Sequence, residues 1–305
     1  MFVLETHNLV KRFDALLAVD DLSFSVAPGE IFGFLGGNGA GKTTTLRMVL
    51  DIVRPTSGSI SLLGSAPSRR TASSIGFLPE ERGLYAGMSA IETIVYFGRL
   101  KGMDKALAKS RGLDLLERFD LRDRAKSRIS DLSKGMAQKV QLATALVNEP
   151  EILMLDEPFS GLDPVNQGLL ENEIRRASDR GAAVIFSTHV MQHAERLCDR
   201  LLLLKKGRKR FEGTLKEARA QLPTRLTAIS RFDLSSLPGV AEGQSSPTED
   251  PEWREWSLKL EPGVDPSQVL EHCSTNGIAL RHWDLLQANL HEVFVQLVGA
   301  EDIKP

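Results

Sequence analysis

A glycine-rich segment carries the residues best suited to chemistry in this chain. Residues 36–44 fit the phosphate-binding pattern G-x-x-x-x-G-K-[ST]. Glycines let consecutive backbone N–H groups face phosphate oxygens, because glycine adopts conformations closed to other residues. The Lys42 ammonium can reach the β- and γ-phosphates of a nucleotide, and the Thr43 hydroxyl can hold Mg²⁺. The candidate phosphate-binding residues are Gly36, Gly37, Asn38, Gly39, Ala40, Gly41, Lys42, Thr43 and Thr44.

The neighbouring segments favour this interpretation over the alternative of an ordinary glycine-rich turn. Residues 30–35 read as a buried strand and residues 44–50 as a helix, so phosphates would lie at a helix N-terminus. Residues 151–158 are an apolar run typical of a strand inside a mainly parallel sheet. That strand ends in Asp156, expected to hold Mg²⁺ through water, and Glu157, expected to polarise the attacking water as general base. The alternative for these two acids is a solvated strand end.

Composition argues against several classes of protein. The apolar fraction of 42% and the charged fraction of 26% are those of an ordinary soluble globular protein. A net charge of −2 argues against a general nucleic-acid binder. Residues 225–305 carry 6 basic and 13 acidic side chains, so the remaining chain is net positive and suits an anionic ligand.

Cys198 and Cys273 lack metal-ligand spacing and are expected to be buried thiols in a reducing compartment. No signal segment and no apolar run of roughly 18–20 residues is present.

Further motifs, in a fixed order, make residues 1–220 resemble the ATP-binding subunits of ABC transporters. Phe13 stands where that family places an aromatic ring on adenine, and Glu80 stands where a loop usually carries glutamine. Residues 132–138, Leu-Ser-Lys-Gly-Met-Ala-Gln, occupy the place of the LSGGQ signature. Residues 160–163 resemble the D-loop, and residues 187–189 resemble the switch-histidine segment. The runs 79–85 and 132–136 resemble a bacterial or archaeal exporter subgroup of sodium, drug or antibiotic efflux.

The resemblance implies ATP and Mg²⁺ as cofactors and assigns further roles. Ser133 and Gly135 would contact the γ-phosphate bound to the opposite subunit, and Asp163 would belong to the same nucleotide site. His189 would contact the γ-phosphate and the attacking water, and Glu80 would bind Mg²⁺ or water. Residue types alone leave other interpretations open: a helix N-cap for Ser133, a structural role for His189 and core packing for Phe13.

The chain departs from the family pattern at a few positions. Gly37 stands where many members have proline, and Glu80 replaces the usual glutamine. Lys134 and Met136 replace a glycine and the glutamine of the signature. These changes leave Ser133 and Gly135 intact, so the ATPase assignment stands while the hydrolysis rate is open.

The expected fold class is α/β, a P-loop nucleoside-triphosphatase core with a helical subdomain, plus a small C-terminal α+β domain. We expect the ATP-binding domain over residues 1–220, its helical subdomain over about 84–150, and the accessory domain over 221–305. Within that last domain, residues 226–232, 253–260 and 278–283 read as strands, 266–276 and 289–298 as helices, and 235–252 as a loop. The basic run 205–210 is interpreted as a hairpin tip centred on glycine, with a nucleic-acid patch as the alternative.

The resemblance implies an ATPase subunit that powers export through a separate polytopic membrane permease. Two copies would bind head to tail with two ATP molecules between them, at the cytoplasmic face of the membrane as a peripheral protein, without nucleic acid. The main alternative is a non-transport ABC ATPase acting on ribosomes or DNA. A weaker one is an unrelated phosphate-loop kinase, which the signature and D-loop segments disfavour.

Overall fold

The computed structural model describes residues 1–68, 71–81 and 83–299. Two compact units divide the chain, Met1–Thr214 and a second that begins at Leu215, and each is described by itself. The sequence predicts the domain boundary a few residues later, near residue 220. Arg82, which belongs to the run 79–85 named above, and residues 300–305 of the predicted accessory domain lie outside the described residues.

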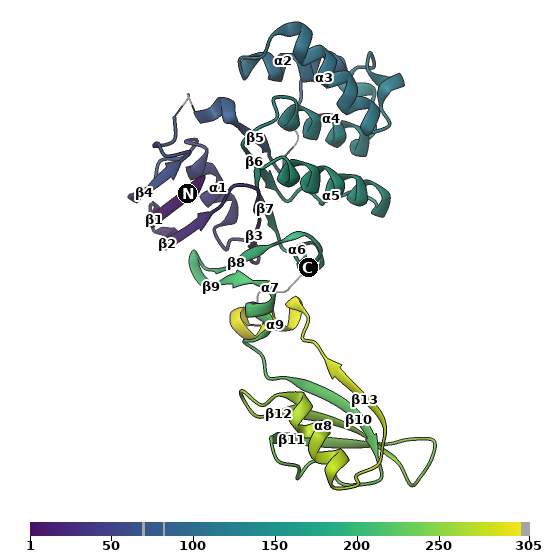
Figure 1. Cartoon of the computed structure of the whole chain (residues 1–305). Helices are drawn as coiled ribbons and strands as arrows, with labels where there is room; N and C mark the ends of the chain where they lie inside the picture. The colour runs from purple at the N-terminus through teal and green to yellow at the C-terminus, as the bar shows by residue number, and fades with distance from the viewer. Residues whose placement is uncertain (69–70, 82, 300–305) are drawn as a thin grey trace. The chain divides into compact units, whose positions relative to one another are not determined.

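A six-stranded sheet forms the centre of the first unit, in the order β5-β6-β7-β3-β8-β9 (Figure 1). All neighbouring pairs are parallel except β8 and β9, which form an antiparallel hairpin. The carboxyl ends of the parallel strands therefore lie at one edge, where α/β sheets bind ligands. The strands are β3 (Ile31–Leu35), β5 (Ile75–Leu78), β6 (Ile152–Asp156), β7 (Ala183–Thr188), β8 (Arg200–Lys205) and β9 (Arg208–Thr214).

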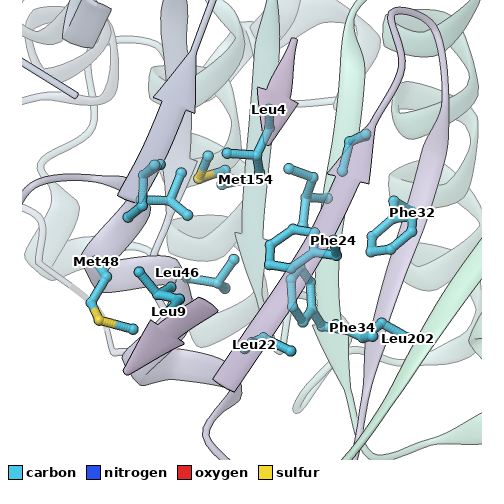
Figure 2. Close-up of a cluster of buried hydrophobic side chains, with 14 of the residues drawn as sticks. Leu4, Leu9, Leu22, Phe24, Phe32, Phe34, Leu46, Met48, Met154 and Leu202 are labelled. Carbon is cyan, nitrogen blue, oxygen red and sulfur yellow. The ribbon is translucent and has the colours of Figure 1, made fainter. Parts of the chain in front are cut away.

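Both faces of this sheet are covered, which explains why its strands are uninterrupted apolar runs. Successive side chains of a strand point to opposite faces. Phe32 and Phe34 of β3 belong to the cluster shown in Figure 2, together with Met154 and Leu202 from other strands. Gly33 faces the other way, towards Cys198. The predictions of buried strands at residues 30–35 and 151–158 are confirmed, although β3 begins one residue later and β6 covers only Ile152–Asp156.

An antiparallel sheet in the order β2-β1-β4 covers this cluster. Leu4 and Leu9 of β1 and Leu22 and Phe24 of β2 contribute apolar side chains, and the Phe24 and Phe34 rings meet edge to face with centroids 4.9 Å apart (Figure 2). Sequence reasoning did not predict this sheet. Its strands are β1 (Leu4–Phe13), β2 (Leu16–Val26) and β4 (Ser57–Leu62).

The described part of the first unit contains six α-helices. Figure 1 shows α2, α3 and α4 together as the helical part of this unit, within the range predicted for the helical subdomain. Ser89 and Glu92 form a capping box at the start of α2, which satisfies backbone N–H groups of the first turn. The helices are α1 (Lys42–Val49), α2 (Ala90–Leu100), α3 (Lys105–Arg118), α4 (Lys134–Leu146), α5 (Pro164–Asp179) and α6 (Met191–Leu197).

The second unit contains a four-stranded antiparallel sheet in the order β11-β12-β10-β13, with α8 packed on it. Trp256 and Leu258 of β12 pack with Val269 and Cys273 of α8 in a separate apolar core. The prediction of a loop over residues 235–252 is wrong, because β11 lies within it. The elements are α7 (Leu215–Arg219), β10 (Arg225–Ser230), β11 (Val240–Pro247), β12 (Arg254–Leu260), α8 (Pro266–Thr275), β13 (Leu280–Leu286) and α9 (Leu290–Val298).

Both cysteines are buried free thiols, as predicted. In the part of the chain that the structure describes, no helix has the length and apolarity required to cross a membrane.

Candidate functional site

The glycine-rich segment links β3 to α1 in a backbone conformation that requires glycine at two positions. Gly41, the N-cap of α1, has a φ of 103°. A Cβ atom at Gly41 would lie 2.7 Å from the Ala18 carbonyl oxygen, and one at Gly36 would lie 2.6 Å from the Leu204 carbonyl oxygen. Only glycine fits such close backbone contacts. The first turn of α1 therefore begins directly at Lys42, with its free N–H groups at the end of the loop.

Lys42 is held inside the loop. Its side chain is nearly buried, and its Nζ atom donates to the carbonyl oxygens of Gly36 at 2.6 Å and Gly37 at 3.3 Å. The same Nζ lies 3.4 Å from Oε1 of Glu157. The loop thus fixes a cation beside the acid that follows β6.

The two residues expected to hold Mg²⁺ lie together. The Thr43 hydroxyl donates to Oδ1 of Asp156 at 3.2 Å, and Asp156 is buried at the end of β6. Ser187 of β7 donates to the same oxygen at 2.6 Å. Asp156 and Ser187 are partners in the register of the parallel strands β6 and β7. Hydroxyl and carboxylate oxygens are the donors that Mg²⁺ prefers, so this pair fits the predicted metal.

Glu157 lies between two groups that can stabilise its charge. Its Oε2 is 3.0 Å from Nδ1 of His189, while its Oε1 faces Lys42. An ionised carboxylate only accepts hydrogen bonds, so Nδ1 of His189 carries the proton in this contact. The backbone of Glu157 is left-handed, with a φ of 47°, and its N–H donates to the Ser187 hydroxyl at 2.9 Å. Ser187 therefore anchors both acids, a role that sequence reasoning missed.

A cavity of about 600 Å³ joins these residues. Its size is in the range of small-molecule sites. The predicted residues from Gly37 to Thr44 line it with Glu80, Glu157 and His189. Five further lining residues were not among the predicted site residues, although Ser160 belongs to the segment that resembles the D-loop: Leu16, Leu17, Ala18, Ser160 and Lys206.

Three other predicted residues lie at separate positions. Ser133 is the N-cap of α4 and accepts a hydrogen bond from the Met136 N–H at 3.3 Å, with Gly135 in the first turn. Asp163 is the N-cap of α5, and the hydrogen bond from the Asn166 backbone lowers the pKa of its carboxyl group. None of these three is among the residues that line the cavity described above.

Phe13 also lies outside the cavity lining, but close to it in the strand register. It is 43% exposed at the end of β1, so the alternative of core packing is wrong. The Lys11 ammonium lies over its ring, 4.7 Å from the centroid. Phe13 pairs with Leu16 of β2, which does line the cavity.

A side-chain amide connects the helix that begins after Ser133 with the segment that follows Glu157. Nε2 of Gln138 in α4 donates to the Pro158 carbonyl oxygen at 2.9 Å and lies 3.5 Å from that of Ser160. This hydrogen bond connects α4 directly to the backbone beside Glu157.

Comparison with known proteins gives consistent matches. The sequence profile of the family described as "ABC transporter" matches residues 19–160. The chain is 38% identical over 305 residues to the uncharacterized ABC transporter ATP-binding protein YhaQ of Bacillus subtilis, covering 98% of this chain and 99% of the relative. It is 43% identical over 213 residues to the Nod factor export ATP-binding protein I of Paraburkholderia xenovorans, covering 69% of this chain and 70% of that protein.

Solved structures match about seven tenths of the chain. A structure described as the ATP binding subunit of an ABC transporter is 33% identical with a TM-score of 0.68, covering 72% of this chain and 92% of the other. The structure of cbiO1 from Clostridium perfringens, described as part of the ABC transporter complex cbiONQ, is 26% identical with a TM-score of 0.64 and covers 72% and 91% of the two chains.

Proposed function

The chain belongs to the ABC transporter ATP-binding proteins, a family of ATPases, and on that premise we propose that it powers export through a separate membrane permease. The observation that carries the proposal is the set of contacts that joins the glycine-rich loop to the acids and the histidine: Thr43 contacts Asp156, and Glu157 contacts both Lys42 and His189. ATP is the nucleotide, and it would lie along residues 36–44.

The loop and its neighbours supply distinct parts of the proposed chemistry. The backbone N–H groups of residues 37–44 and the Lys42 ammonium would bind the phosphates. Thr43 and Asp156 would hold Mg²⁺, with Glu80 as a further ligand or water contact from the cavity wall. The metal would neutralise phosphate charge when bound. Phe13 would stack on adenine beyond Leu16, and its exposed ring supports that use.

Glu157 and His189 would prepare the attacking water. Glu157 would accept the proton as general base, and the Nδ1–H contact at 3.0 Å orients the carboxylate for that task. His189 is half exposed and leaves its other ring nitrogen for the γ-phosphate and the water. Ser187 holds the backbone of Glu157, so the base keeps its position during the reaction.

Two copies would act together. Ser133, Gly135 and Asp163 lie at the N-termini of α4 and α5, away from the cavity of their own chain. A helix N-terminus attracts anions. These positions support a head-to-tail dimer in which Ser133 and Gly135 of one copy contact the γ-phosphate bound to the other. Hydrolysis would remove that shared contact, and the dimer would reopen.

Contact with a permease would use the loop from Glu80 to Tyr85 and the helices beside it. Tyr85 and Tyr96 are exposed, and their rings meet edge to face with centroids 5.6 Å apart. Exposed aromatic side chains are typical of protein interfaces. A relative named for Nod factor export supports the outward direction. The proposed location is therefore peripheral, on the cytoplasmic face of the membrane.

A Glu157→Gln variant tests the mechanism. The variant is expected to lose ATP hydrolysis by at least about a hundredfold, since general bases contribute 10²–10⁴. Gel filtration is expected to show a dimer with Mg-ATP and a monomer with ADP. A variant that stays monomeric with bound ATP would contradict the dimer, and full activity of Ser133→Arg would contradict the role of α4.

Co-purification of a polytopic membrane protein supports transport, whereas ribosomes or nucleic acid in its place would reverse that conclusion.

A further inference from the structure

The hairpin formed by β8 and β9 brings a lysine to the edge of the nucleotide cavity. Lys205 and Arg208 pair across the hairpin, so Lys206 and Gly207 form a two-residue turn. Their φ angles are 49° and 78°, the pattern of a type I′ turn. Such a turn matches the twist of the strands it joins, so Lys206 starts from a well-defined backbone.

This turn is fixed to the phosphate-binding loop and to β2. The Gly207 N–H donates to the Ala40 carbonyl oxygen at 3.0 Å, and the Gly207 carbonyl oxygen accepts from the Asp20 N–H at 2.9 Å. A Cβ atom at Gly207 would lie 2.8 Å from the Ala18 carbonyl oxygen. The backbone next to Lys206 is therefore hydrogen-bonded directly to the loop that would hold the phosphates.

Two other cations of the basic run are held in ion pairs. Arg208 pairs with Asp20 at 2.6 Å, and Lys209 pairs with Glu212 at 2.7 Å. Lys206 is exposed, lines the cavity and has no ion pair with any described residue. The backbone N–H of Asp20 donates to Gly207 of the turn, but the Asp20 carboxylate is already paired with Arg208.

The strand order gives Lys206 a definite side of the cavity. The phosphate-binding loop follows β3, which lies between β7 and β8 in the sheet. Glu157 follows β6 and His189 follows β7, both on one side of β3, whereas Lys206 follows β8 on the other side. If Glu157 and His189 act at the γ-phosphate, Lys206 faces the part of the nucleotide that ATP and ADP share.

We propose that Lys206 is a nucleotide-binding residue whose ammonium contacts the diphosphate portion common to ATP and ADP. The inference rests on the proposed use of this cavity for ATP. A lysine ammonium is a mobile point charge that binds phosphate without fixed geometry, which suits an exposed position at a cavity edge. It would raise the affinity for both nucleotides and contribute little to the difference between them.

The test compares the Kd of Mg-ADP and Mg-ATP for the wild type, Lys206→Asn and Lys206→Arg, measured by calorimetry at two salt concentrations. Asparagine removes the charge and tolerates the left-handed backbone better than alanine does. Lys206→Asn is expected to raise the Kd of both nucleotides by a similar factor of about three to ten, typical of one exposed charge contact. Lys206→Arg is expected to retain wild-type affinity within about twofold, and salt is expected to reduce the difference.

Arg210→Asn is the matched control, since Arg210 is an exposed cation of the same hairpin outside the cavity lining. An equal loss of nucleotide affinity in Arg210→Asn would overturn the Lys206 contact, because it would show that any positive charge on the hairpin has the same effect. An unchanged Kd in Lys206→Asn would overturn it, and so would a loss for ATP alone. A wild-type protein that binds neither nucleotide would overturn the ATP site itself, whereas wild-type binding with an unaffected Lys206→Asn overturns only the role of Lys206.

Discussion

The imidazole ring of His193 stacks on the phenyl ring of Phe159, with centroids 4.0 Å apart and planes 11° apart. Phe159 lies two residues after Glu157, and His193 lies four residues after His189. Arg196 is 3.1 Å from Nδ1 of His193. The stack therefore joins the segments that carry the two groups proposed to prepare the attacking water.

Burial gives His193 a predictable effect on stability. Loss of solvent lowers the pKa of its imidazole, Arg196 lowers it further, and Glu171 and Glu157 oppose the change. The unfolded chain, with a histidine pKa of about 6.5, therefore takes up this proton at higher pH than the folded chain does. Above that pH the imidazole is neutral in both states. As the pH falls below it, protonation of the unfolded chain lowers the free energy of unfolding. The free energy of unfolding is expected to decrease less steeply between pH 7.5 and 5 in His193→Phe than in the wild type.

Urea unfolding at several pH values measures this difference. His7→Gln is the control, because His7 is exposed on β1. Parallel pH profiles of His193→Phe and the wild type would rule out the proposed linkage.

Gly33 is predicted to tolerate no side chain while Cys198 is present. A Cβ atom at Gly33 would lie 2.5 Å from Sγ of Cys198. Gly33→Ala is expected to lower the free energy of unfolding by about 1–3 kcal/mol, the usual cost of overpacking. Removing the sulfur in a Gly33→Ala/Cys198→Ala double variant is expected to recover part of that loss. A double-mutant cycle by denaturant unfolding measures the coupling, and additive effects would show that the two positions do not compete for space.

Glu173 is predicted to connect α5 with the helical part of the first unit. Its carboxylate is nearly buried and lies 3.2 Å from Arg118 of α3 and 3.1 Å from Arg176. Glu173→Gln is expected to cost about 1–2 kcal/mol of stability, less than a fully buried pair because both arginines are partly exposed. The control is Glu117→Gln, which removes an exposed pair with Arg122 and is expected to change stability by about 0.5 kcal/mol or less. Equal effects of the two variants in thermal unfolding would contradict the structural role of Glu173.

Ser187 is predicted to affect catalysis through the two acids that it anchors. Ser187→Ala removes the donor to Asp156 and the acceptor of the Glu157 N–H. We expect kcat to fall about tenfold and the Mg²⁺ concentration for half-maximal activity to rise, because each buried group loses a hydrogen bond worth roughly 1 kcal/mol. Ser187→Thr keeps the hydroxyl group and is expected to retain most activity. Steady-state ATPase assays over a range of Mg²⁺ concentrations measure both effects. Wild-type kinetics in Ser187→Ala would show that Ser187 has no role in catalysis.

The buried parallel strands were the most predictable part of the molecule. Because β3, β6 and β7 are covered on both faces, their sequences are short apolar runs, and the polar residues that follow mark the carboxyl edge of the sheet. The hairpin of β8 and β9 was predictable from the glycine between the apolar run 201–204 and Phe211. The assignment of Lys42, Asp156 and Glu157 to one site followed from this edge, whereas His189 was assigned by the family resemblance. The structure brings the four side chains together.

Other elements lacked a clear signal in the sequence. The register of β1 with β2 shifts between Thr6 and Leu9 and again before Lys11, which breaks the alternation of apolar and polar residues. Strand β11 is a polar edge strand that contains glycine and ends at Pro247, so it reads as a loop. The cavity residues Leu16 and Lys206 come from hairpins, and their positions depend on tertiary contacts that no local pattern contains.

The hydrogen bond from Gln138 to the Pro158 carbonyl oxygen has a kinetic consequence in the proposed dimer. The helix that begins after Ser133 would meet the nucleotide of the other copy, while Glu157 serves the nucleotide of its own copy. Gln138 joins these two parts within each chain, so ATP bound at one site adjusts the base at the other. Hydrolysis by mixed dimers of wild-type and Ser133→Arg chains should therefore fall below the average of the two homodimers, a form of cooperativity in rate.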